Sequence, residues 1–436
     1  MTTDEVGGAE ASTSQARGAD DQSRPKVDDP SPLAIAAEFM RGRQNTFWSQ
    51  RGTPSTALGD REEVGKRLRA HYNGMEFADD TERERWTVEL ESFLAHWTDR
   101  PSSSWETAAT DGIIRRVAEP ILRYARRRYP DRASPLVGTA HHGLQTANAY
   151  NVPGSDVAVI LLDVGLVTAV HVFAELIAEI FPTRESVDGR TLMITDPDEI
   201  EARLRHRPDL AIRASYIATR FASGEGADTR MLSTRLAHNS IGDLFRDVAE
   251  TFVTSHEIAH VMLGHLDGWP SDQPVIVGDD SACETRDSSD GELEGGAPAR
   301  EDAETEADVR GVEYAIAVLS ERGIPPAVGS LGPEIYFGVL LLVRQVEAAR
   351  VRADLSLVDL SLVDGGGGVG YRSLQFRRAH VRAVLERSMP EQDLASYHRA
   401  RDAVESALAA ILWASVRTVD VCLGRPVRPT RVPGDV

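Results

Sequence analysis

The stretch TSHEIAHVMLGH, from Thr254 to His265, constrains this chain more than any other. Its flanks carry apolar residues at helical spacing without proline, which predicts a helix from about Ile241 to Leu266. Residues i and i+4 of a helix lie about 40° apart, because each residue advances the chain by about 100°. His256 and His260 should therefore point the same way, with Glu257 one step round the helix.

Two imidazoles at this spacing are a typical pair of zinc ligands, and the intervening glutamate is placed to take a proton from water. The pattern HExxH also arises by chance. A buried pair of structural histidines is therefore the alternative interpretation of His256 and His260, and a third ligand at a suitable place would decide against it.

A third ligand is predicted in EDAETEADVRGVEYAIAVL, residues 301–319. Helical spacing places Glu304, Asp308, Gly311 and Ala315 on one face, and the two small residues allow another helix to approach closely. Zinc held by two histidines needs a third protein ligand. We expect Glu304 to bind the metal and Asp308 to hydrogen-bond a ligand imidazole.

Other candidate ligands fit less well. His265 lies nine residues after His256, so it would face away from the metal if the helix continued. Its expected role is helix-end packing or support of a ligand. The metzincin pattern fails, because it needs a glycine and a histidine seven and ten residues after the first histidine. Glu301, Glu306 and Glu313 are interpreted as solvated charges, and His141 and His142 as surface or turn residues.

The combination of HExxH with a helix bearing ExEAD resembles the gluzincin metallopeptidases of the M48 type, the HtpX- and Ste24-like proteases. The resemblance implies that Glu304, the first residue of ExxxD, is the third zinc ligand. NAYNVPGSDVAVILLDVGL, Asn148 to Leu166, is similar to that family's NAFxxPGG segment and following strand. It implies that Asn148 and Ala149 lie at a sheet edge that binds substrate. HEIAHVMLGH also resembles the regulatory metalloproteases of the ImmA/IrrE type.

The sequence departs from the M48 type in three respects. Residues 182–240 separate the strand from the HExxH helix, and the usual membrane spans are absent. The late HPxxxR-like motif is not recognisable. YRSLQFRRAHVR occupies a similar place and leaves Tyr371, Arg378 and His380 as alternatives for stabilising an oxyanion.

The predicted fold class is α+β and predominantly helical, with a zincin-like core around a small sheet. Polar composition predicts a disordered tail over 1–30, and a helical N-terminal region should follow over 31–134. The metallopeptidase domain should span 135–426 and include an acidic disordered loop over 268–299. Residues 427–436 form a second tail.

The composition of the chain indicates which kinds of partner and which cellular compartment to expect. The net charge of −20 argues against nucleic acid. The two cysteines, Cys283 and Cys422, form no CxxC pair. No apolar run reaches the ~20 residues of a membrane span, and the N-terminus lacks the pattern of a signal peptide. We expect a cytoplasmic protein without transmembrane segments.

These observations favour a soluble Zn²⁺-dependent metallopeptidase that acts on a peptide or protein substrate. Glu257 would be its general base, and His256, His260 and Glu304 its metal ligands. The alternative is a metal-dependent regulatory or defence protein that uses the same fold mainly to bind a partner, with little or no proteolysis.

Overall fold

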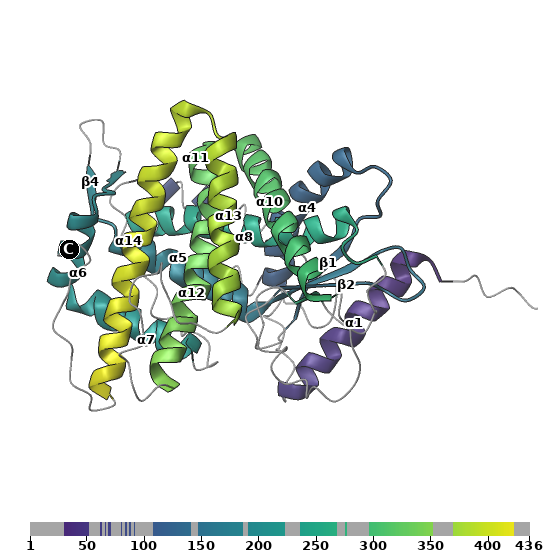
Figure 1. Cartoon of the computed structure of the whole chain (residues 1–436), viewed down its shortest axis with the longest axis horizontal. Coiled ribbons are helices and arrows are strands. Elements are labelled where there is room, and N and C mark those ends of the chain that lie inside the picture. The colour runs from purple at the N-terminus through teal and green to yellow at the C-terminus, as the bar shows by residue number, and fades with distance from the viewer. Residues whose placement is uncertain are drawn as a thin grey trace, which may run out of the picture. The chain divides into compact units, whose positions relative to one another are not determined.

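The computed structural model of the chain is predominantly helical with a small sheet, which confirms the α+β class (Figure 1). It describes residues 30–51, 108–140, 147–185, 191–222, 236–267, 275–276, 296–351 and 369–422, with isolated positions between 62 and 91. Both predicted tails and most of the acidic loop therefore lie outside the described residues. Residues 32–436 form one compact unit.

Four strands form the main sheet, in the order β1-β3-β2-β6. They are β1 (Leu136–Ala140), β2 (Ala147–Tyr150), β3 (Val159–Asp163) and β6 (Val275–Ile276). All five residues of β3 are buried, as its apolar sequence VILLD requires. β1 runs parallel to β3. β2 runs antiparallel to β3, and the turn that connects them includes Gly154, whose φ of 74° favours glycine.

The strand β6 lies within the segment that the sequence predicts to be structureless. Ile276 pairs with Asn148, and Val275 pairs with Ala149. The following helix, α10, begins at Gly296 rather than at the expected Glu301. The acidic segment therefore contributes a strand to the sheet and the first turn of a helix.

The helix that carries HExxH, α8 (Leu236–Leu263), is packed on several sides. Its neighbours are α4 (Ala108–Arg128), α5 (Val164–Ile180), α10 (Gly296–Glu321) and α12 (Leu331–Val351). Glycines permit two of these approaches. A Cβ on Gly332 of α12 would lie 2.5 Å from the carbonyl oxygen of Val248, and Gly311 of α10 is similarly close to His256.

Helix α1 (Pro32–Arg51) contacts the sheet at β1 and β3. Ala36 and Met40 of α1 join Tyr150, Val159 and Leu161 in a small apolar cluster. The main core lies among the other helices and includes Ala147, Ile160 and Leu162 from the alternate positions of the same strands. The helices and the sheet thereby enclose apolar side chains on both faces of the sheet.

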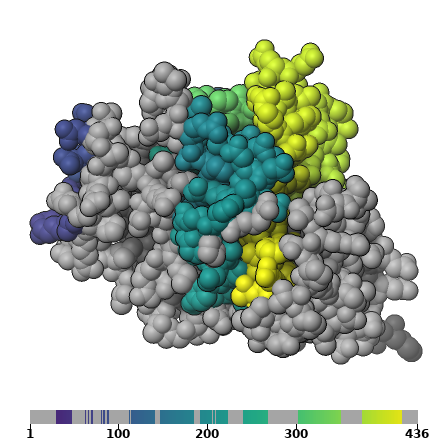
Figure 2. Space-filling view, turned by 90° about the vertical axis from the view of Figure 1, so that its left-hand side faces the viewer, coloured from purple at the N-terminus to yellow at the C-terminus, as the bar shows by residue number. Residues whose placement is uncertain are grey.

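The C-terminal helices α13 (Val369–Ser388) and α14 (Glu391–Cys422) pack beside α12 (Figure 1). α14 also contacts α6 (Pro197–His206) and α7 (Pro208–Ala222), whose residues have teal colours in Figure 2. The remaining described elements are β4 (Thr183–Glu185), β5 (Thr191–Met193) and α11 (Pro326–Gly329). One described helical stretch, Pro326–Ala349, has the length and hydropathy of a membrane span, and 83% of its most apolar window is buried inside the protein.

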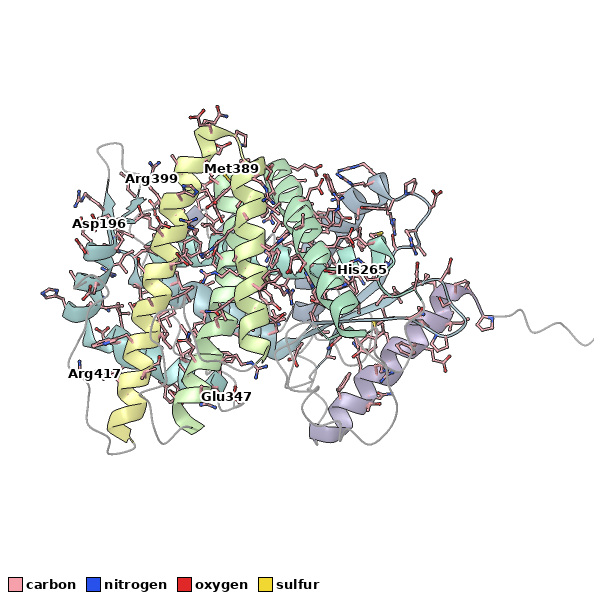
Figure 3. All side chains as sticks on the ribbon, viewed as in Figure 1. Asp196, His265, Glu347, Met389, Arg399 and Arg417 are labelled. Atoms are coloured by element: carbon pink, nitrogen blue, oxygen red, sulfur yellow. The ribbon has the colours of Figure 1, made fainter. Side chains whose placement is uncertain are left out.

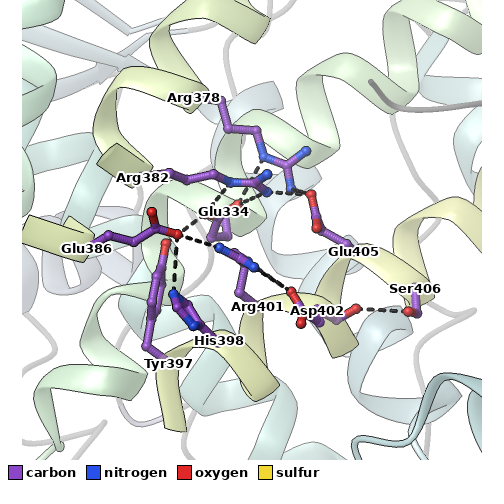
Figure 4. A network of polar contacts seen from close by, with 10 residues as sticks. All are labelled: Glu334, Arg378, Arg382, Glu386, Tyr397, His398, Arg401, Asp402, Glu405 and Ser406. Carbon is purple, nitrogen blue, oxygen red and sulfur yellow. Dashed lines mark hydrogen bonds and ion pairs between the residues drawn. The ribbon is translucent and has the colours of Figure 1, made fainter. Parts of the chain in front are cut away.

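A buried ion network joins α12, α13 and α14 (Figure 4). Glu334 accepts hydrogen bonds from Arg378 Nε at 2.9 Å, Arg382 Nε at 2.8 Å and the Tyr397 hydroxyl at 2.9 Å. Burial acts to raise the pKa of Glu334, but the two guanidinium groups outweigh it and lower the pKa. Arg378 Nη2 also lies 3.1 Å from Glu405. The part of the network around Glu334 therefore pairs Glu334 and Glu405 with two guanidinium groups, Arg378 and Arg382, so its formal charges balance.

Candidate metal centre

Three side chains from two helices meet at one point. His256 and His260 of α8 have their Nε2 atoms 3.0 Å apart, and each lies 3.5 Å from an oxygen of Glu304 on α10. Donor atoms held tetrahedrally at about 2.0–2.2 Å from a zinc ion would lie roughly 3.3–3.6 Å apart. The observed separations are close to that geometry, so this buried group could bind a metal ion.

The burial of the acidic groups supports the same conclusion. Glu304 is 7% exposed and Glu257 is fully buried. Among the described residues, neither carboxylate finds a hydrogen-bond partner for either of its oxygens. Arg377 lies 3.0 Å from Glu304 Oε2 but makes no hydrogen bond to it, so a metal ion would supply the partner that these buried oxygens lack. The residues present thus fit a divalent cation.

Gly311 sets the distance between the two helices at this point. A Cβ at this position would lie 2.9 Å from both the backbone nitrogen and the Cα of His256, closer than real contacts allow. Any larger residue would push α10 away from α8. The small residue predicted on this face is what brings Glu304 and Asp308 to the histidines.

Asp308 supports the first histidine. Its Oδ1 lies 2.8 Å from His256 Nδ1, and the carboxyl group is fully buried. If Nδ1 holds its proton toward Asp308, a metal ion would bind at His256 Nε2, which faces His260 and Glu304, and would displace any proton there. This carboxylate–histidine arrangement is typical of metal sites, where it fixes the tautomer and orientation of the ligand.

Arg377 of α13 completes this side of the site, and the sequence did not single it out. Its Nε and Nη2 donate to Asp308 at 2.7 and 2.8 Å. Its Nη1 lies 3.0 Å from Glu304 Oε2, an ion-pair distance without hydrogen-bond geometry. The only signal was the FRR of YRSLQFRRAHVR, and local periodicity cannot tell which arginine faces the site.

The surroundings shift the pKa values of the ionisable groups of the site in different directions. Burial acts to raise the pKa of Glu304, but Arg377 and His260 hold it well below its ordinary value. Burial lowers the pKa of His260 to about 4, so this imidazole is neutral, the form that binds metals. Burial also acts to lower the pKa of His256, but Asp308 and Glu304 raise it to about 9. Burial raises the pKa of Glu257 to about 8.

His265 lies just beyond the end of α8 (Figure 3). The helix ends at Leu263, and Gly264 has a φ of 78°. His265 Nδ1 thereby reaches within 3.0 Å of His260 Nδ1, and its Nε2 lies 3.3 Å from Glu306 Oε2. The expectation that His265 faces away is wrong, because it assumed a continuing helix. Glu306, which the sequence predicted to be a solvated charge, has a side chain that is 56% exposed, and it also lies close to His265.

Asn148 and Ala149 are buried on β2, which contacts α8. Their strand is paired with β3 on one side and with β6 on the other. The edge that the sequence assigned to substrate is therefore occupied by residues Val275 and Ile276 of the chain itself.

A cavity of about 40 Å³ lies between the sheet and the helices α4, α5 and α8. Glu250, Val253 and Thr254 line it from α8. They precede Glu257 by seven, four and three residues, so they lie along the same face of the helix as that carboxyl group. Most of the other lining residues are apolar.

The remaining candidates fall outside the site or outside the described residues. Arg378 belongs to the Glu334 network. His380 contacts the ring of Phe376. Glu313 pairs with Arg128 and Arg310. The side chains of Tyr371, His141, His142 and Glu301 lie outside the described residues.

Comparisons of the chain with protein-family models, with curated proteins and with solved structures find no match. The description of this protein therefore rests on its fold and its site. It is a predominantly helical α+β protein with a buried His256–His260–Glu304 group that could hold a metal ion.

Proposed function

We propose that the protein is a zinc-dependent metallopeptidase of the gluzincin type. The observation that carries the proposal is Glu257, a fully buried carboxyl group without a hydrogen-bond partner among the described residues. It directly follows His256, whose Nε2 is turned toward the other two ligands. A purely structural metal site has no use for such a group.

The number of ligands points in the same direction. Structural zinc sites are closed by four protein ligands, whereas catalytic sites have three and keep one position open. Within the described part of the chain, three residues form the group. Two histidines and one carboxylate suit zinc, which accepts nitrogen and oxygen donors.

The proposed chemistry is the hydrolysis of a peptide bond. A bound zinc ion would supply Lewis acidity, which lowers the pKa of water and polarises a carbonyl group. Glu257 would accept a proton from the attacking water and deliver it to the nitrogen of the leaving amine. Burial raises the pKa of Glu257 to about 8 in the metal-free protein, and the charge of a bound metal ion would lower it toward the carboxylate form that accepts a proton.

Two further residues would hold the ligands in place. Asp308 fixes His256 through its Nδ1, and Arg377 neutralises the adjacent carboxylates of Asp308 and Glu304. Neither would touch the substrate. Their part is to keep three donor atoms at distances that suit one metal ion.

The sheet also agrees with a zincin-like core, which we infer from its arrangement. The HExxH helix contacts β2, and β2 runs antiparallel to its neighbour β3. An extended peptide could add to this strand by main-chain hydrogen bonds. Since β6 already pairs there, such a peptide would have to replace β6. The cavity along the Glu257 face has room for an apolar side chain.

A second candidate function is a metal-dependent regulatory or defence protein that binds a partner and cleaves little or nothing. The observation in its favour is again β6, which covers the edge of β2 with the protein's own chain. In this alternative the metal centre stabilises the fold that recognises the partner, and Glu257 has no catalytic part.

One experiment separates the two candidates. Cells expressing the wild-type protein or the Glu257→Gln variant are compared for newly formed peptide termini across the proteome, with zinc content measured for both purified proteins. The peptidase predicts a set of termini present with wild type and absent with Glu257→Gln at equal zinc content. Identical termini in the two samples would overturn the peptidase in favour of the binding protein.

A further inference from the structure

We propose that His265 and Glu306 form a hydrogen-bonded arm that positions His260 for metal binding. The inference rests on the proposed metal centre and assigns a role to two residues outside the ligand set. It is carried by two contacts, from His260 Nδ1 to His265 Nδ1 at 3.0 Å and from His265 Nε2 to Glu306 Oε2 at 3.3 Å.

The end of α8 builds this arm. Gly264 adopts a φ of 78°, and the backbone nitrogen of His265 donates to the carbonyl oxygen of His260 at 3.0 Å. A left-handed glycine with such a bond is a common helix terminus. It turns the chain back over the last turn of the helix, and His265 is thereby brought onto the imidazole of His260 instead of pointing away.

The order of protons along the arm follows from the donors and acceptors. A carboxylate such as Glu306 can only accept, so the proton of His265 lies on Nε2. Its Nδ1 then carries a lone pair and accepts the proton of His260 Nδ1. His260 is left with a lone pair on Nε2, the atom that lies 3.0 Å from His256 Nε2 and 3.5 Å from Glu304.

The two ligand histidines thus have different supports. His256 is held by Asp308, which is completely buried, whereas the arm behind His260 ends at Glu306, whose side chain is 56% exposed. A hydrogen bond to a charged group is stronger than one between two neutral imidazoles. The loss of His265 should therefore cost less zinc affinity than the loss of Asp308.

The test uses the full chain and zinc affinity, measured by competition with a chelator. His265→Phe removes the acceptor and keeps a ring, so zinc affinity should fall by about 10-fold, the lower end of the usual effect of losing a partner of a ligand and less than in Asp308→Asn. His265→Asn places an oxygen near the position of Nδ1 and should recover most of that loss. Glu306→Gln keeps a neutral acceptor and should cost roughly threefold to tenfold.

Asp302→Asn, an exposed change on the same helix, is the matched control and should leave zinc affinity unchanged. Nitrogen NMR of the zinc-loaded protein gives a readout that packing alone would not change. The wild type should show a hydrogen-bonded proton on His260 Nδ1, and His265→Phe should lose its protection from exchange.

Unchanged zinc affinity in His265→Phe would overturn this inference alone. Equal losses in His265→Phe and His265→Asn would also overturn it, because packing rather than an acceptor would then be responsible. A wild-type protein that binds no zinc would overturn the proposed metal centre, and the arm with it.

Discussion

His256 Nδ1 lies 2.8 Å from Asp308 Oδ1 across the interface of α8 and α10. Asp308 in turn accepts hydrogen bonds from Nε and Nη2 of Arg377 on α13. Three helices that are distant in sequence therefore fix one imidazole. This arrangement gives the site a defined geometry before any metal binds, and most of the predictions below follow from it.

Substitutions of the carboxyl groups of α10 should lower the zinc affinity by different amounts. Glu304→Gln replaces an anionic donor by a neutral amide, so zinc affinity should fall steeply. Asp308→Asn should reduce it by about 10–100-fold, because only the support of His256 is lost. Asp302→Asn should behave like the wild type. Chelator competition measures all three, and a larger loss in Asp308→Asn than in Glu304→Gln would contradict the assignment.

Arg377→Met should destabilise the metal-free protein more than the zinc-loaded one. Removing the guanidinium leaves Glu304 and Asp308 as buried carboxylates without their countercharge, at a cost of about 3–5 kcal/mol. Zinc beside Glu304 would restore part of that countercharge. Thermal unfolding with and without zinc measures the difference, with the exposed Arg399→Met as control. Equal destabilisation of both forms would argue against a metal near Glu304.

Gly311→Ala should weaken zinc binding although alanine favours helices. The added Cβ would lie 2.9 Å from the backbone of His256 and would force α10 away from α8. At Gly42, which has nothing within 4 Å, the same change should be neutral or stabilise by about 0.5–1 kcal/mol. Zinc affinity and unfolding curves of the two variants give the comparison. If Gly311→Ala bound zinc as tightly as the wild type, the close approach of α10 to α8 would not depend on a glycine at this position.

Glu175 gives a pH prediction independent of the metal. Burial raises its pKa from 4.5 to about 8. Between these values the folded protein keeps a proton that the unfolded chain has lost, so the free energy of unfolding falls as the pH rises. Glu175→Gln removes this dependence, and its stability relative to wild type should increase from pH 5 to pH 8. Parallel pH profiles of the free energy of unfolding for wild type and Glu175→Gln would refute the shift.

The parts of the site that the sequence predicts are those set by local periodicity. HExxH and ExxxD each place their residues on one helical face, and Gly311 on that face indicated the close approach of the helices. Arg377 and Arg378 could not be distinguished, because neighbouring residues on a helix point about 100° apart. Only the packing of α13 directs Arg377 to Asp308 and Arg378 to Glu334.

The structure differs from the sequence-based predictions at two further places, His265 and β6, and each difference has a physical cause. His265 was predicted to face away because the helix was extended to Leu266, although Gly264 is a typical helix-ending residue. The strand β6 has only two residues and lies in an acidic segment. Such a short strand carries no alternation of its own, and its place is set by the unpaired edge of β2.

The central claim is that His256, His260 and Glu304 hold zinc while Glu257 does not. Metal analysis of the purified protein tests it most directly. We expect about one zinc per chain in the wild type and in Glu257→Gln, and a loss of zinc in His256→Ala, His260→Ala and Glu304→Gln with most helical content retained. Full zinc in the histidine variants, or its loss in Glu257→Gln, would show that these ligands are wrongly assigned.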